Sequence, residues 1–371
     1  MGLHNLNYFH PVNSRISSIH PIYIELGSLA PAIEHLKAAG KVYTSVFFTV
    51  DEAVSGSFLN GYLGAYAESS PRLVLHGGES QKNTGGLERI WAFLIENHAD
   101  RSSLLVNIGG GALCDVAGFA ASTYMRGIDF IQVPTTLLAM VDASVGGKTA
   151  INAGGIKNSV GTFCMPAAVC IEPAFLETLP LPERKSGLAE MIKHGLIASS
   201  THYESVIPFI ENSQIPPTGL IRDSIAIKSD IVERDPTEKG ERKLLNFGHT
   251  VGHGIESYLS TQPGLAVLHG EAVAAGMLAE LYISVCEEGF VNGEAEQIYP
   301  VLLELAKNVR VSDEMIPGII QCIKHDKKNL AQAIGISLLK ATGKGVWAKY
   351  TDEMQLAAAL RFMIQKQKEY V

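Results

Sequence analysis

The sequence predicts an α/β nucleotide-binding domain with a parallel sheet, followed by a mostly α-helical domain, with the active site in the cleft between the two. In the first half of the chain, short β-branched runs alternate with helical patterns, which is typical of a parallel sheet covered on both faces. In the second half, long helical patterns follow one another with almost no strand signal. The change falls at the proline-rich stretch 179–182, so we expect domains at 1–182 and 183–371.

The expected elements of the first domain follow the apolar runs in order. Strands are expected at 43–50, 72–75, 103–108, 129–133 and 167–171, where short runs rich in β-branched residues occur. Helical patterns occupy 51–66, 86–98 and 113–125 between them. Beyond residue 183 the patterns are helical, and 335–339 is a weak strand candidate.

Length and charge narrow the class of protein. The 371 residues suggest about two domains. The chain has 30 Lys and Arg against 38 Asp and Glu, a net charge of −8. This acidic balance disfavours binding to nucleic acid or an anionic membrane, because both need a basic face. No apolar run is long enough to span a membrane and no signal-peptide core is seen, so we expect a cytoplasmic protein.

The five cysteines are odd in number, form no CxxC pair and sit among apolar residues. We therefore expect buried, reduced thiols. They are Cys114, Cys164, Cys170, Cys286 and Cys322.

A glycine-rich turn follows the expected strand 103–108. Gly109, Gly110 and Gly111 lead directly into the next helix, an order that lets backbone N–H groups approach a pyrophosphate. The dinucleotide fingerprint GxGxxG would need glycine at Cys114. A phosphate-binding turn and an ordinary tight turn between strand and helix both remain open.

A second glycine-rich segment, 144–149, imitates the end of a P-loop. The full P-loop pattern requires glycine where Asp142 stands, which rejects a nucleoside-triphosphatase. Lys148 and Lys157 lie in this region and Arg126 lies just upstream. In an acidic protein these residues indicate a local anion site.

Polar residues of the second half are spaced for one helix face. Arg242, Asn246, His249 and His253 are 4, 3 and 4 residues apart, which on one α-helix would align them over roughly 16 Å. Close approach to a ligand or close helix packing would explain the glycines among them, which are Gly248, Gly252 and Gly254.

Further metal-ligating residues lie on neighbouring expected helices. His269 begins the next helix, and Glu190, Lys193 and His194 share a face of an earlier one. Two histidines and a carboxylate are a common catalytic metal set. Residue types alone do not decide which two histidines would be ligands.

From about residue 50 to 329, the chain resembles the 3-dehydroquinate synthases, a family of the sugar-phosphate cyclase group. The runs that carry this resemblance are 109–115, 124–127, 134–149, 157–158, 189–196, 244–256 and 268–277.

The resemblance implies three sets of site residues. The metal, zinc or alternatively cobalt, would be held by Glu190, His249 and His269. The implied NAD-binding residues are Asp51, Glu79, Lys82, Gly110, Gly111, Asp115, Thr135, Thr136, Asp142, Lys148, Lys157 and Thr178. The implied catalytic residues are Lys148, Asn158, Lys193 and His253, and the implied substrate-binding residues are Arg126, Lys228, Arg242, Asn246 and Lys327.

The resemblance also implies the reaction of the shikimate pathway that turns 3-deoxy-D-arabino-heptulosonate 7-phosphate into 3-dehydroquinate and phosphate. Transient oxidation by NAD, β-elimination of phosphate, re-reduction and an intramolecular aldol closure would follow in that order. It further implies a homodimer. The rivals are another sugar-phosphate cyclase, a metal-dependent polyol dehydrogenase, and a non-catalytic protein derived from an enzyme.

Overall fold

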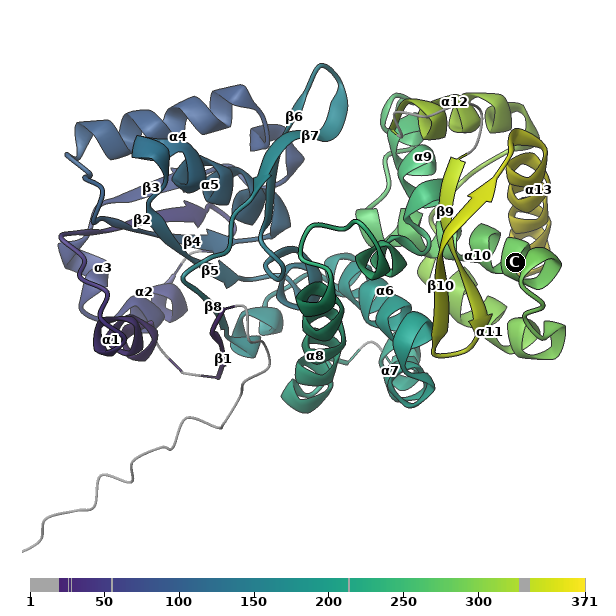
Figure 1. Cartoon of the computed structure of the whole chain (residues 1–371), viewed down its shortest axis with the longest axis horizontal. Helices are drawn as coiled ribbons and strands as arrows, with labels where there is room; N and C mark the ends of the chain where they lie inside the picture. Colours follow the sequence, from purple (N-terminus) through teal and green to yellow (C-terminus); the bar gives the residue numbers. More distant parts are fainter. Residues whose placement is uncertain are drawn as a thin grey trace, which may run out of the picture.

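A six-stranded sheet forms the centre of the first half of the chain (Figure 1). The computed structural model describes residues 20–370 except 26, 28, 55, 213 and 327–333. The strands run in the order β1-β8-β5-β4-β2-β3, and each neighbouring pair is parallel. Their bounds are β1 Ile22–Ile24, β2 Val46–Asp51, β3 Arg72–Leu75, β4 Leu104–Gly109, β5 Asp129–Pro134 and β8 Ala168–Ile171.

Helices cover both faces of this sheet, as the continuous apolar runs of its strands require. On β4, Leu105 packs in a cluster with α4 and α5, whereas its neighbour Val106 packs in the cluster that includes α1 and α2. Successive strand residues point to opposite faces, so each face has its own core. The helices are α1 Ala30–Ala38, α2 Ser57–Leu63, α3 Tyr66–Ser69, α4 Thr84–Glu96 and α5 Gly111–Thr123.

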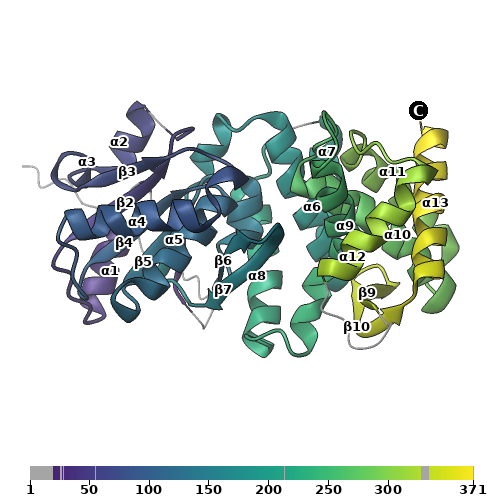
Figure 2. The same ribbon diagram turned by 90° about the horizontal axis from the view of Figure 1, so that it is seen from above.

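The second half is mostly helical and surrounds α10, which is buried along most of its length. Figures 1 and 2 show this half beside the sheet half along the long axis of the molecule. No helix of the described residues is long and apolar enough to cross a membrane. The helices are α6 Leu181–Ala198, α7 Ser200–Asn212, α8 Thr218–Arg234, α9 His249–Ser260, α10 His269–Glu287, α11 Asn292–Leu305, α12 Ile316–Asp326 and α13 Glu353–Tyr370.

The predicted fold class is confirmed, and all five expected strands are present within about three residues of their predicted ends. Two hairpins add strands that the sequence analysis missed. β6 (Lys148–Ala153) and β7 (Ile156–Phe163) form an antiparallel hairpin whose second strand is largely exposed, so it lacks the apolar pattern of a core strand. β9 (Ile334–Ala341) includes the weak candidate and pairs with β10 (Lys344–Thr351). The short β1 was also missed.

Three detailed expectations were wrong. The helical pattern 51–66 is divided, because Gly64 ends α2 with φ +58° before α3 begins. The predicted stripe from Arg242 to His253 is not one helix. Arg242 and Asn246 lie in a 3-10 helix, η5 (Glu241–Asn246), and Gly248 adopts φ +80° before α9 begins, a left-handed conformation that interrupts an α-helix. Among the free cysteines, Cys286 is exposed rather than buried.

Candidate active site

The glycine turn lies at the carboxyl ends of β2, β4 and β5. Gly109 ends β4, Gly110 caps α5, and Gly111 begins it. A Cβ at Gly110 would lie 3.3 Å from Cγ2 of Thr136, and a Cβ at Gly109 would lie 3.0 Å from the Cβ of Asp51. Close packing by itself therefore explains glycine here. The arrangement still offers the N-terminus of α5 at the edge of a parallel sheet where ligands bind in open α/β folds.

A charged group flanks this turn. The Lys82 ammonium lies 2.6 Å from Oδ2 of Asp115 on α5 and 3.9 Å from Oε1 of Glu79. Burial by itself would lower the pKa of Lys82, but the two carboxylates outweigh that effect and raise it. Lys82 is thus a buried cation. Thr178, by contrast, donates within its own turn, to the carbonyl of Phe175.

A carboxylate and two histidines converge where α6, α9 and α10 meet. Glu190 is fully buried on α6. Its Oε1 lies 3.6 Å from Nε2 of His249, the first residue of α9, and 3.6 Å from Nε2 of His269, the first residue of α10. This oxygen has no hydrogen-bond partner among the described residues, and a buried carboxylate oxygen without a partner is costly.

The two separations from Glu190 are compatible with a tetrahedral divalent ion. Ligand atoms about 2.1 Å from such an ion are about 3.4 Å apart, close to the two observed separations of 3.6 Å. Each imidazole also has an acceptor at its other nitrogen. Nδ1 of His249 lies 3.2 Å from the Phe247 carbonyl, and Nδ1 of His269 lies 3.3 Å from Oε2 of Glu256. Partners of this kind orient metal-ligating histidines.

The charges at this cluster are strongly coupled. Burial alone would lower the pKa of His269, but the contact with Glu256 and the negative charges of Glu190 and Glu256 raise it to about 10. Burial alone would raise the pKa of Glu190, but Lys193 and His249 hold it well below its usual range. The carboxylates that favour a proton on His269 would equally favour a divalent cation.

Two other sets of residues could hold a metal. His253 joins His249 and His269 in a group whose nitrogens lie within 4.8 Å of one another. Asp142, Glu190 and His194 form the second group. That group is less suitable, because the Asp142 carboxylate already pairs with the ammonium of Lys228 and an additional cation would be repelled.

Buried cations lie next to the metal-ligand candidates. Lys193 forms an ion pair with Glu190 and lies 4.0 Å from Oδ1 of Asp142. Lys228 on α8 donates to the Asp142 carbonyl at 2.6 Å. Burial outweighs this partner and lowers the pKa of Lys228 to about 8. Arg242 is 1% exposed and donates to the carbonyls of Gly146 and Pro236.

Several contacts join the two halves of the chain at this place. Lys148 at the start of β6 pairs with Glu238, which also accepts from Nδ2 of Asn246 at 2.6 Å. Lys157 on β7 lies 2.7 Å from Oε1 of Glu256 on α9. Figures 1 and 2 both show the β6–β7 hairpin and α8 between the sheet and the helical half.

Two predicted substrate-binding or catalytic residues, Arg126 and Asn158, are not brought into this group. Arg126 is exposed in the 3-10 turn η2 (Tyr124–Arg126), at the opposite end of α5 from the glycine turn. Asn158 is exposed on β7, where its backbone N–H donates to Asn152. Lys327 lies outside the described residues, and its neighbour Lys324 pairs with Glu353 at the start of α13.

The geometry adds two residues for which the sequence analysis gave no role. Glu256 could have been found from spacing, because it lies three residues after His253 and seven after His249 on the same helix face. Glu238 lies in a loop with φ +60°. No local pattern could have indicated its contacts with Lys148 and Asn246.

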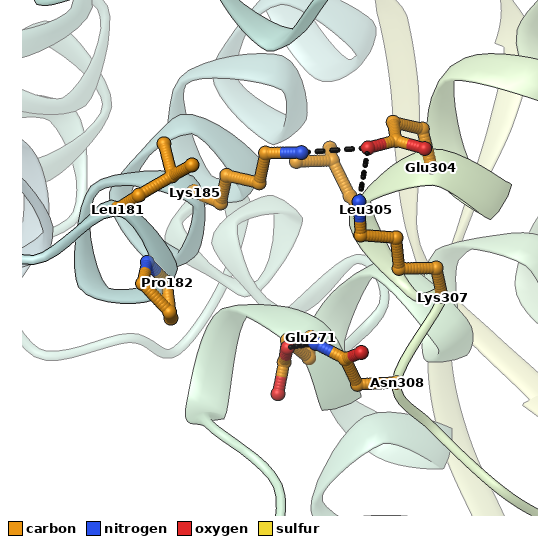
Figure 3. A pocket seen from close by; sticks show the side chains of 8 residues that line it. All are labelled: Leu181, Pro182, Lys185, Glu271, Glu304, Leu305, Lys307 and Asn308. Atoms are coloured by element: carbon orange, nitrogen blue, oxygen red, sulfur yellow. Dashed lines mark hydrogen bonds and ion pairs between the residues drawn. The ribbon is translucent and has the colours of Figure 1, made fainter. Parts of the chain in front are cut away.

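The helical half also contains cavities that lie apart from this cluster. One has a volume of about 90 Å³ and lies between α6, α11 and the start of α10 (Figure 3). Across it, Glu304 accepts from Lys185 at 2.6 Å and from Lys307 at 2.8 Å. These charged groups of the cavity lining thus pair with one another, and the ion pair between Lys185 and Glu304 connects α6 to α11.

Solved structures with this architecture define the class. A 2-deoxy-scyllo-inosose synthase in complex with carbaglucose-6-phosphate, NAD+ and Co2+ is 26% identical, covers 88% of this chain and 94% of its own, and has a TM-score of 0.75. An NADH-dependent butanol dehydrogenase of Thermotoga maritima shares the fold with a TM-score of 0.62 at 14% identity, covering 93% of this chain and 96% of its own. The fold is the one that sugar-phosphate cyclases have.

Sequence comparisons identify the family within that class. Residues 72–186 match the model of the 3-dehydroquinate synthase N-terminal region, and residues 187–329 match that of the C-terminal region. A 3-dehydroquinate synthase of Parabacteroides distasonis is 44% identical over 74% of this chain and 78% of its own. One of Pyrobaculum islandicum is 40% identical over 80% and 87%. The chain belongs to the 3-dehydroquinate synthase family.

Proposed function

We propose that this chain is a 3-dehydroquinate synthase, which converts 3-deoxy-D-arabino-heptulosonate 7-phosphate into 3-dehydroquinate and phosphate. The single observation that carries the proposal is the unpartnered, buried Oε1 of Glu190, which has two histidine nitrogens 3.6 Å away. The charged residues around it come from both halves of the chain. An enzyme that must bind a cofactor and a sugar phosphate next to each other requires such an arrangement.

We propose NAD and one divalent ion, zinc or cobalt, as the cofactors. The 2-deoxy-scyllo-inosose synthase that shares the fold contains NAD+ and Co2+. When bound, NAD supplies reversible oxidation of a ring alcohol, and the ion supplies polarisation of substrate hydroxyls. Glu190, His249 and His269 would hold the ion. The residues around the α5 turn, together with Lys82 and Asp115, would hold the NAD.

The cations of this site would bind the two anionic ends of the substrate. A planar carboxylate is best met by an arginine fork with neighbouring ammonium and amide donors, which Arg242, Lys228 and Asn246 provide. Nε of Arg242 has no partner among the described residues and remains available as a donor. Lys148 would bind the phosphate end, and the role of Asn158, which is exposed on β7 outside this group, stays a prediction.

Proton movement would depend on His253 and Lys193. His253 lies beside both proposed histidine ligands, with its ring centroid 5.2 Å from that of His249 and 5.7 Å from that of His269. An imidazole can take up and return a proton near neutral pH. Lys193 carries a buried positive charge beside Glu190, which would stabilise negative charge developing on the substrate.

Several features remain part of this proposal. They are a boundary between domains at 182, a cytoplasmic location, a homodimer, and roles in substrate binding for Arg126 and Lys327. The meeting of the two family models between residues 186 and 187 supports a boundary near that position.

Substrate choice tests the function. The unmodified protein should release phosphate from the heptulosonate phosphate with only catalytic amounts of NAD. It should reject sedoheptulose 7-phosphate, which lacks the carboxylate, by roughly a thousandfold, because buried donors would be left without a partner. Arg242→Ala should remove most of this preference. Equal turnover of both sugars would contradict the proposal, and consumption of one NAD per turnover would favour a dehydrogenase.

A further inference from the structure

We propose that Glu256 is a positioning residue for the metal centre, because its carboxylate fixes the ring of His269 in the orientation that directs Nε2 at the ion. The inference rests on the proposed function, since it takes Glu190, His249 and His269 as the metal ligands. It assigns to Glu256 a role distinct from that of a ligand.

The first observation is the placement of the Glu256 side chain. It is 8% exposed on α9, on the face that also carries His249 and His253. Its Oε2 lies 3.3 Å from Nδ1 of His269, whose Nε2 is 3.6 Å from Glu190. Glu256, His269 and Glu190 therefore form a line in which the imidazole separates the two carboxylates.

The chemistry of imidazole explains how a carboxylate at Nδ1 prepares Nε2 to bind a metal. A neutral ring carries one proton, so an acceptor at Nδ1 leaves the Nε2 lone pair free for a metal. A carboxylate acceptor also increases the electron density on the ring and strengthens the bond to the ion. His249 is oriented differently, by the carbonyl of Phe247 two residues before it. Of the two histidines, His269 is thus the one whose orientation depends on a side chain from another helix.

The second oxygen of Glu256 explains why a carboxylate can remain buried there. Oε1 accepts from the Lys157 ammonium at 2.7 Å. Without Lys157, the buried Glu256 carboxylate would have only the His269 ring as a partner, and burial of a charge with so little compensation is costly. The β6–β7 hairpin of the first half thereby reaches the residue that positions a metal ligand of the second half.

Metal affinity measured on the full-length apoprotein tests the inference without an activity assay. In Glu256→Gln, Co2+ affinity by chelator competition should fall about 10- to 100-fold, and the visible absorption bands of bound Co2+ should shift. Lys157→Gln removes only the Oε1 contact and should stay within about threefold of the unmodified protein. Glu304→Gln, which removes a two-lysine contact away from the site, is the matched control and should bind Co2+ unchanged.

Each result has a distinct meaning. Unchanged Co2+ affinity and spectrum in Glu256→Gln would overturn the inference, and so would a loss in Lys157→Gln larger than that in Glu256→Gln, which could not act through Glu256. Failure of the unmodified protein to bind one Co2+ would instead contradict the proposed function. If Glu256→Gln does not fold, Glu256→Asp keeps the charge and withdraws the oxygen from the ring. Glu256→Asp should then show an intermediate loss of affinity, and full affinity would overturn the inference.

Discussion

Individual buried polar residues determine the chemistry that this fold can support. Glu190, Lys193 and Arg242 are each 1% exposed or less, positions where a charge persists only with partners. Lys193 neutralises one oxygen of Glu190, and the other faces two imidazoles. This division of one carboxylate between a cation and two nitrogens leaves room for a divalent ion.

Substitution of single histidines distinguishes the two overlapping ligand sets. We expect His249→Ala to lose its bound metal, because only Glu190 and His269 would remain as ligands. His253→Ala should retain about one metal per chain while losing activity. Elemental analysis measures the metal, and circular dichroism verifies that both variants fold. Loss of metal in His253→Ala would favour the three-histidine set.

His20 gives the folded protein a pH dependence of its own. Burial lowers its pKa from 6.5 to about 4, although Glu233 opposes this. Because the folded pKa lies below the unfolded one, the neutral ring is favoured in the fold, and stability is lost as pH falls from about 6.5 towards 4. Between pH 7 and pH 5 the loss should be about 2 kcal/mol.

Urea unfolding at the two pH values measures this effect. In His20→Leu the difference between pH 7 and pH 5 should be smaller than in the unmodified protein by that amount. His194 and His202 also have lowered pKa values through burial, so part of the pH dependence should remain. An identical difference in both proteins would contradict the assignment to His20.

At the scale of elements, the contact between α9 and α10 positions the two histidines that we propose as ligands, His249 and His269. A Cβ at Gly252 would lie 2.8 Å from the Ala272 carbonyl oxygen, and one at Gly254 would lie 2.3 Å from Cγ1 of Ile323 on α12. Of the two explanations left open by the sequence, close helix packing is therefore the one observed. The Glu280 carboxylate of α10 also accepts from the N–H groups of Gly248 and Val251 at the start of α9.

Enlarging a glycine at this contact should disturb the metal site from a distance. A Cβ at Gly276 on α10 would lie 1.9 Å from the Gly248 carbonyl oxygen, so the helices would have to separate. Gly276→Ala should cost about 3 kcal/mol and weaken metal binding, because His249 and His269 would move apart. Gly293→Ala on α11, where a Cβ meets nothing within 4 Å, is the control. Normal Co2+ affinity in Gly276→Ala would show that the site tolerates movement of these helices.

At the scale of the molecule, the candidate site depends on packing between the halves. One apolar cluster includes both Ile131 of the sheet and Ile192 of α6, so the halves share a continuous core. Polar contacts such as Lys228 with Asp142 complete the junction. These contacts hold together the proposed substrate and cofactor residues, which come from opposite halves.

Metal removal should therefore be visible in the stability of the whole protein. The three ligand candidates come from α6, α9 and α10, and an ion at 100 times its Kd adds about 2.7 kcal/mol. Chelation should lower the Tm of the unmodified protein by about 3 °C, as measured by calorimetry. The Tm of His249→Ala should not respond to the chelator. A response of equal size in that variant would place the ion elsewhere.

The sequence by itself determined five of the six strands of the parallel sheet, the change to helices near residue 180 and the identity of the residues with metal-ligating chemistry. Buried parallel strands are continuous apolar runs, and this signal is local. The tertiary structure alone decided that Gly248 interrupts the predicted stripe and that the glycines serve helix packing. It also decided that Glu256 contacts His269 while Arg126 lies at the far end of α5. These depend on which elements meet in space, and residue spacing along one element carries no information about a partner that comes from another.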